Sequence, residues 1–154
     1  MSEVLVATDA DWILDEVRAA LADGESTIRW VRNGKDVVPA LSAREADLVV
    51  LDLQIGNMGG MATCMEIHLE AGAGRLCDPG VLMLLDRAAD VFLAQRCEAD
   101  GWLIKPLDAF RLRRAADAII RGETYREGVP AEPEVASPEV GEEIEPAGAD
   151  AEVG

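Results

Sequence analysis

The stretch Asp47–Leu53 constrains the fold more than any other part of the chain. Residues 48–51 are all aliphatic and are followed at once by Asp52. An apolar run without polar alternation predicts a strand buried on both faces, as in a parallel sheet. The loop after it, residues 54–60, carries three glycines and an asparagine, which are typical of the end of a strand. Asp52 is therefore expected at the carboxyl end of a central strand, which is the edge where open α/β sheets bind ligands. An aspartate that only ends a strand and caps its loop would show the same pattern.

Three further apolar runs, and one segment that alternates like a strand nearer a sheet edge, repeat this rhythm along the chain. They cover residues 4–7, 27–31, 81–85 and 102–104. The segments between them space their apolar residues as helices do, and Asp108 is placed to cap a last helix. Five β–α units with short loops predict an α/β domain, residues 1–121, with a doubly wound five-stranded parallel sheet and helices on both faces.

The composition changes at residue 122. Residues 122–154 hold four of the seven prolines, five glycines and ten acids against the single base Arg126, for a net charge of −9. Such a segment cannot bury enough apolar surface to fold by itself. We expect residues 122–154 to form an acidic tail, disordered alone or extended along a partner, and not an output domain.

The net charge of −16 argues against a direct nucleic-acid or anionic-membrane partner, because both are polyanions. No run approaches the about 18 apolar residues of a membrane span, and acids interrupt the first apolar run, so no signal peptide is indicated. Cys64, Cys77 and Cys97 are odd in number and lack CxxC spacing, which favours reduced thiols over a disulfide or zinc framework. These features predict a cytoplasmic protein.

Three charged residues are expected at one edge of the predicted sheet. Asp9 follows the first strand, Asp52 ends the third and Lys105 follows the fifth. Two converging carboxylates suit a hard divalent cation such as Mg²⁺, which prefers oxygen ligands. A lysine beside them can balance the charge of a phosphoryl group.

This constellation resembles the receiver domain of two-component response regulators. The resemblance covers residues 3–121, and its strength lies in the order and spacing of several runs. These runs are Val4–Val6 with Asp9, Asp47–Leu53 with Met58 and Gly60, and Ala99–Pro106.

The resemblance implies a role for each residue of the constellation. Asp52 would be the phosphoacceptor, and Asp9, Asp52 and the carbonyl of Gln54 would bind the metal. Lys105 would contact the phosphoryl group, and the peptide bond after it would be cis. Trp102 takes the place of the switch aromatic, which is usually tyrosine or phenylalanine in this family.

Two departures from the family pattern affect phosphorylation directly. The family places two adjacent acids after the first strand, and here the first of them is Thr8. The family's fourth strand ends in a serine or threonine that contacts the phosphoryl group, and here that switch position is Leu85, or Asp86 if the register is shifted by one. No serine or threonine occurs anywhere in residues 64–123. We therefore expect Mg²⁺ binding to be weak and the usual switch to be broken.

Two functions remain open. The first is an atypical stand-alone receiver, not an enzyme, that acts as a protein-interaction or accessory subunit. The pattern resembles the orphan receivers that accompany the respiratory NADH–quinone oxidoreductase, which would bring the chain to the cytoplasmic face of the inner membrane through its partner. The alternative is a signalling protein that is phosphorylated on Asp52 by a histidine kinase.

Two other groups of residues have competing interpretations. His68 is the only histidine, and a half-buried structural role is favoured over a phosphoacceptor role. The last helix carries a basic set of residues, which fits either a solvated face or a docking patch. The set is Arg111, Arg113, Arg114 and Arg121.

Overall fold

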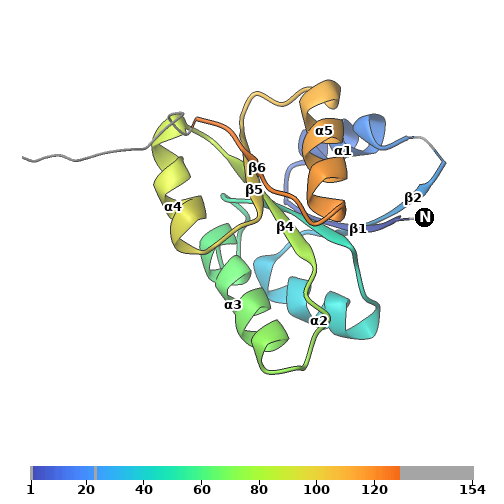
Figure 1. Cartoon of the computed structure of the whole chain (residues 1–154), viewed down its shortest axis with the longest axis vertical. Coiled ribbons are helices and arrows are strands. Elements are labelled where there is room, and N and C mark those ends of the chain that lie inside the picture. The colour runs from blue at the N-terminus through green and yellow to red at the C-terminus, as the bar shows by residue number, and fades with distance from the viewer. Residues whose placement is uncertain (1, 23, 129–154) are drawn as a thin grey trace, which may run out of the picture.

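The computed structural model describes residues 2–22 and 24–128 of the chain. Its centre is a six-stranded parallel sheet with the order β2-β1-β3-β4-β5-β6 (Figure 1). The strands are β1 (Ser2–Ala7), β2 (Ser26–Val31), β3 (Leu48–Asp52), β4 (Gly80–Leu85), β5 (Gly101–Ile104) and β6 (Tyr125–Arg126). Their parallel pairing through helical crossovers confirms the predicted α/β class.

Five α-helices cover the two faces of the sheet. They are α1 (Asp11–Ala20), α2 (Val37–Ala43), α3 (Gly60–Gly72), α4 (Val91–Arg96) and α5 (Ala109–Ile120), and short 3₁₀ turns at 34–36 and 88–90 precede α2 and α4. Helices α1 and α5 pack on one face, and α2, α3 and α4 pack on the other (Figure 1). Pro39 lies in the first turn of α2, where its missing N–H would have no partner within the helix, so it does not break the helix.

Strand β3 divides its side chains between the two faces, as its unbroken apolar run predicts. Leu48 and Val50 belong to the core under α1 and α5, whereas Val49 and Leu51 belong to the core under α2–α4. All four are at most 1% exposed. Fully burying such a side chain contributes roughly 1.5–3 kcal/mol, so this strand anchors both cores.

The prediction of five strands was one strand short. Tyr125 and Arg126, which were assigned to the acidic tail, pair in parallel with Gly101 and Trp102 and form β6 at the edge of the sheet. A two-residue edge strand leaves no periodic pattern in the sequence, because its stability comes from contacts with β5 and not from its own apolar face. The rest of the predicted tail, residues 129–154, lies outside the described residues.

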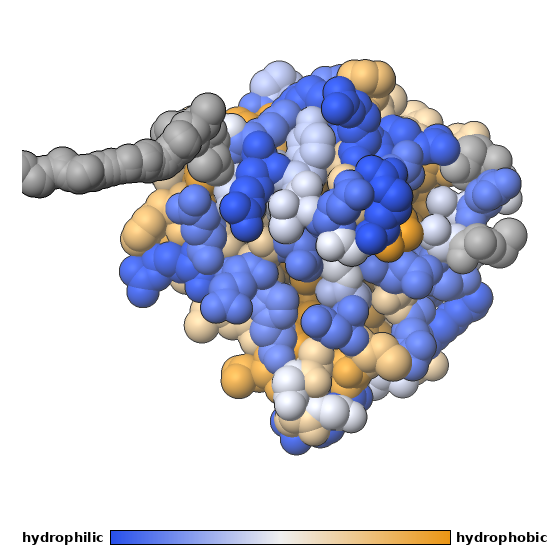
Figure 2. All heavy atoms as spheres, in the orientation of Figure 1, coloured by the Kyte–Doolittle hydropathy of each residue, from blue (hydrophilic) through white to orange (hydrophobic). Residues whose placement is uncertain are grey.

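Three further features concern the polarity of the surface, the state of the cysteines and the absence of a membrane-spanning helix in the described residues. Polar side chains dominate the face that carries α5 and β6, while apolar side chains gather toward the margins near α3 and α4 (Figure 2). Cys64 and Cys97 are buried and Cys77 is exposed, and all three are free thiols. Across residues 2–22 and 24–128, no helix has both the length and the apolar character needed to cross a membrane.

Candidate functional site

Asp52 lies at the carboxyl end of β3 with its side chain almost fully buried. It is 2% exposed. The hydroxyl of Thr8 donates a hydrogen bond to its Oδ2 at 2.8 Å, and the backbone N–H of Gln54 donates to its Oδ1 at 3.1 Å. Lys105 Nζ completes the set at 2.8 Å from Oδ1. A buried carboxylate is costly unless it is paired and hydrogen-bonded, and these three donors meet that requirement.

Lys105 joins two carboxylates that come from different strands. Its Nζ lies 2.8 Å from Asp52 Oδ1 and 2.8 Å from Oδ1 of Asp86, the residue after β4. Burial acts against the charged ammonium, but the hydrogen bonds to Asp52 and Asp86 outweigh it and raise the pKa of Lys105. The peptide bond between Lys105 and Pro106 is cis, as the resemblance implied.

Thr8 and Asp9 occupy the end of β1 in very different ways. Thr8 is fully buried, donates to Asp52 and accepts a hydrogen bond from the Ala10 N–H at 3.1 Å. Asp9 is exposed, and its Oδ2 accepts from the Gly56 N–H at 3.3 Å. The first position of the predicted acid pair is therefore a neutral hydrogen-bond donor that is already engaged with Asp52.

Trp102 lies inside the domain on β5, and its hydrogen bond and cation–π contact come from β6 and the residue after it. The side chain is 2% exposed. Its Nε1–H donates to the carbonyl of Glu127 at 2.7 Å, and the Arg126 guanidinium lies 5.9 Å from the ring centre. Leu85 belongs to the same buried cluster as Trp102 and ends β4 opposite Ile104. The pairing fixes the register, so Leu85 and not Asp86 is the last residue of β4.

Comparison with known proteins identifies the family. A model of the response regulator receiver domain matches residues 4–117. The chain belongs to the response regulator receiver family. The response regulator protein PmrA of Pseudomonas aeruginosa is 30% identical over 123 residues, which are 80% of this chain and 54% of PmrA. The transcriptional regulatory protein CseB of Streptomyces avermitilis is 27% identical over 122 residues, covering 78% of this chain and 49% of CseB.

Solved receiver structures share the fold. The receiver domain of NtrX from Brucella abortus superposes with a TM-score of 0.64 at 26% identity, covering 77% of this chain and 98% of that domain. The chemotaxis response regulator CheY4 of Vibrio cholerae gives a TM-score of 0.67 at 20% identity, covering 76% of this chain and 97% of that protein. The chain spans about half the length of the first curated relatives that it matches.

The acidic residues of this receiver do not fit a strong Mg²⁺ site. The predicted oxygen donors are Asp9, Asp52 and the carbonyl of Gln54, and Thr8 adds no charge to them. Nowhere in residues 2–22 and 24–128 do three His, Cys, Asp or Glu side chains gather in a way that could hold a metal ion. Affinity for hard cations depends on the number of carboxylates, and weak Mg²⁺ binding at this site stays a prediction.

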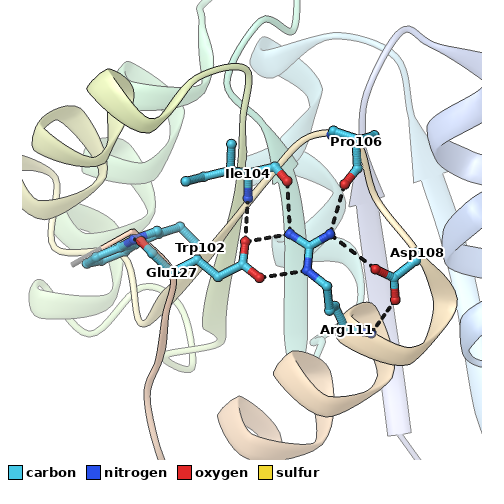
Figure 3. Close-up of polar contacts among 6 residues, drawn as sticks. All are labelled: Trp102, Ile104, Pro106, Asp108, Arg111 and Glu127. Carbon is cyan, nitrogen blue, oxygen red and sulfur yellow. Dashed lines mark hydrogen bonds and ion pairs between the residues drawn. The ribbon is translucent and has the colours of Figure 1, made fainter. Parts of the chain in front are cut away.

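Two residues of the receiver's polar framework escaped the sequence analysis. Asp86 was considered only as a shifted switch position, although it shares Lys105 with Asp52. Glu127 was counted among the acids of the tail, although its side chain is bound by Arg111 and its carbonyl by Trp102 (Figure 3). A sequence signal existed only for Asp86, because it directly follows an apolar strand at the same sheet edge.

The remaining candidates have structural partners. His68 is half-buried, and its Nε2 lies 3.0 Å from the Glu98 carbonyl, between α3 and the end of α4. Each arginine of this basic set has a partner within the domain, and the two interpretations, a solvated face and a docking patch, both stay open. Their partners are Glu127 and Asp108 for Arg111, Asp117 for Arg113, Phe110 for Arg114 and Glu123 for Arg121.

Proposed function

We propose that this receiver acts as a protein-binding module, and not as an enzyme or a phosphorylation-driven switch. In a receiver switch, a hydroxyl at the end of β4 would connect the phosphoacceptor to the aromatic on β5. Here that position is the buried Leu85, which has no hydrogen-bonding group. Trp102 is held inward by the Glu127 carbonyl independently of Asp52. This arrangement around Leu85 and Trp102 is the observation that supports the proposal.

The contacts of Asp52 support the same conclusion. Both of its oxygens are engaged, one by Thr8 and the other by Lys105 and Gln54. A phosphoryl transfer to Asp52 would have to rearrange these donors, and Thr8 adds no carboxylate to hold a cation that screens the developing charge. Displacing a hydrogen bond to a charged group costs about 1.5–3 kcal/mol.

The alternative function is a phosphoryl-accepting signalling protein that a histidine kinase phosphorylates on Asp52. It is favoured by one feature, the retained pair of Asp52 and Lys105 at 2.8 Å. Under the first proposal, the resemblance offers the respiratory NADH–quinone oxidoreductase as the partner assembly, at the cytoplasmic face of the inner membrane.

Incubation with acetyl phosphate and Mg²⁺, followed by intact-mass spectrometry, separates the two functions. The wild-type chain should carry no more phosphoryl adduct than Asp52→Asn. The double variant Thr8→Asp/Leu85→Thr restores the missing acid and hydroxyl, and should gain an adduct that depends on Mg²⁺. A stoichiometric, Asp52-dependent adduct on the wild-type chain would establish the signalling alternative.

A further inference from the structure

A short strap, residues Thr124–Gly128, closes the free edge of the sheet. It leaves the end of α5, pairs with β5 through Tyr125 and Arg126, and reaches the start of α4 (Figure 1). A Cβ placed on Gly128 would lie 3.0 Å from Ile104 Cδ1 and 3.4 Å from Val91 Cγ2, so the strap backbone packs closely against β5 and α4. The strap therefore occupies a site that is formed by other parts of the domain.

The carboxylate of Glu127 fills a receptor for a single acidic side chain. Arg111 Nε donates to Oε2 at 2.6 Å, Arg111 Nη2 donates to Oε1, and the backbone N–H of Ile104 donates to the same Oε1 at 2.9 Å (Figure 3). The two-point contact of the guanidinium with the carboxylate gives direction as well as strength. Burial by itself would raise the pKa of Glu127. The hydrogen bond from Arg111 outweighs burial, and the pKa of Glu127 is lowered.

The receptor is fixed by residues outside the strap. Arg111 Nη1 donates to the Pro106 carbonyl at 2.8 Å and to Asp108 Oδ2 at 3.2 Å, and Nη2 donates to the Ile104 carbonyl at 2.9 Å. None of these contacts involves the strap, so all of them remain available to the guanidinium when Glu127 is absent (Figure 3). Such a site is organised in advance for a carboxylate, which reduces the entropy lost on binding.

The strap also shows what kind of chain the site accepts. The edge of β5 supplies main-chain pairing, and the Trp102 indole donates to the carbonyl of the residue that carries the carboxylate, at 2.7 Å. Main-chain pairing at a sheet edge gives affinity for any extended peptide, and side-chain pockets give specificity. The combination fits an extended strand, parallel to β5, that presents one glutamate to Arg111.

We propose that the β5 edge and Arg111 form a binding site for a glutamate-bearing strand of a partner protein. The strap fills this site in the isolated chain, and the partner strand replaces it. The strap is suited to exchange because its strand pairing spans only two residues. Elements with few contacts unfold locally at a lower free energy than the core of the domain. The use of this site by a partner protein rests on the proposed function as a binding module. The ability of the site to bind a strand does not depend on that function.

The test uses a synthetic peptide of residues 122–128 as the strand and the full chain carrying Glu127→Ala as the receptor. Nuclear magnetic resonance follows the Ile104 amide and the Trp102 indole N–H, without Mg²⁺ or a phosphodonor. The peptide should shift both signals saturably in Glu127→Ala, and at least tenfold higher peptide should be needed in the wild-type chain, where the strap competes at high effective concentration. Glu123→Ala, which changes an acid outside the receptor, should behave as the wild type.

A second peptide, carrying Glu127→Gln, tests the carboxylate receptor and should bind about tenfold more weakly. Equal binding of the two peptides, or no shift at millimolar peptide, overturns the proposal.

Hydrogen exchange in the wild-type chain is the independent measurement if Glu127→Ala does not fold. The Ile104 amide should exchange faster than the Leu84 amide of the central sheet, and exchange of both at the rate of global unfolding overturns the proposal. None of these outcomes depends on phosphorylation, so failure here leaves the acetyl phosphate experiment to decide the proposed function separately.

Discussion

At the scale of single residues, the Thr8 hydroxyl changes the electrostatics around Asp52. An aspartate at position 8 would place a second negative charge beside a buried carboxylate, and a cation would be needed to relieve the repulsion. Thr8 instead donates a hydrogen bond at 2.8 Å, and Lys105 neutralises the charge from the other side. The buried Asp52 carboxylate is therefore hydrogen-bonded and paired by groups of the protein itself.

Lys105 should make stability depend on alkaline pH. Its folded-state pKa is raised above the unfolded value of about 10.4, so its contribution is complete below that pH and is lost as pH rises through the folded-state pKa. Urea unfolding should show a free energy of unfolding that falls above about pH 10.5 in the wild-type chain. Lys105→Met should show a shallower fall, because only the contribution of the buried Cys64 thiol, whose pKa is also raised, remains. It should cost about 3 kcal/mol at neutral pH, because the buried Asp52 carboxylate is left without a counterion.

The chain offers a matched control for this measurement. Lys35 is the only other lysine, and it is exposed. Lys35→Met should retain the wild-type decline above about pH 10.5. An equal decline in Lys105→Met would show that the pairing with Asp52 and Asp86 does not stabilise the fold.

At the scale of elements, Gly101 determines how closely β6 and α5 approach β5. A Cβ on Gly101 would lie 2.6 Å from the Tyr125 carbonyl oxygen and 2.8 Å from Ile119 Cδ1. Gly101→Ala should therefore push β6 away and lower the free energy of unfolding by about 1–3 kcal/mol. Gly72→Ala is the control, because nothing lies within 4 Å of its added Cβ and alanine favours the helix by about 0.5–1 kcal/mol. Chemical denaturation of both variants measures the difference, and equal stability would contradict the close packing of β6.

The same elements show what the sequence could and could not predict. Residues 48–51 identify a doubly buried strand because burial on both faces leaves only aliphatic residues, and Asp52 and Lys105 meet because parallel strands end at one edge. Strand β6 has two residues, Tyr125 and Arg126, and its formation depends on a tertiary match with β5 that local composition does not reveal. The ion pair of Arg111 and Glu127 was hidden for the same reason.

At the scale of the whole molecule, the strap moves the boundary between domain and tail. The change in composition at residue 122 predicted that the domain ends near residue 121. In the structure, however, Glu127 is bound by Arg111, Ile104 and Trp102. We therefore expect two truncations to differ. Deleting 129–154 should leave the melting temperature nearly unchanged, whereas deleting 123–154 should lower it by several degrees, because Trp102 and Ile104 each lose a hydrogen-bond partner at about 1–3 kcal/mol. Differential scanning calorimetry compares them, and equal melting temperatures would contradict a structural role for the strap.

The most direct test of the central claim follows the Trp102 indole N–H signal while beryllofluoride, a phosphoryl mimic, and Mg²⁺ are added to the wild-type chain. We expect this signal to stay in place, because the indole is bonded to the Glu127 carbonyl at 2.7 Å and Leu85 has no hydroxyl to connect it to Asp52. A saturable shift of the Trp102 signal that Asp52→Asn abolishes would contradict the account and establish a working phosphorylation switch.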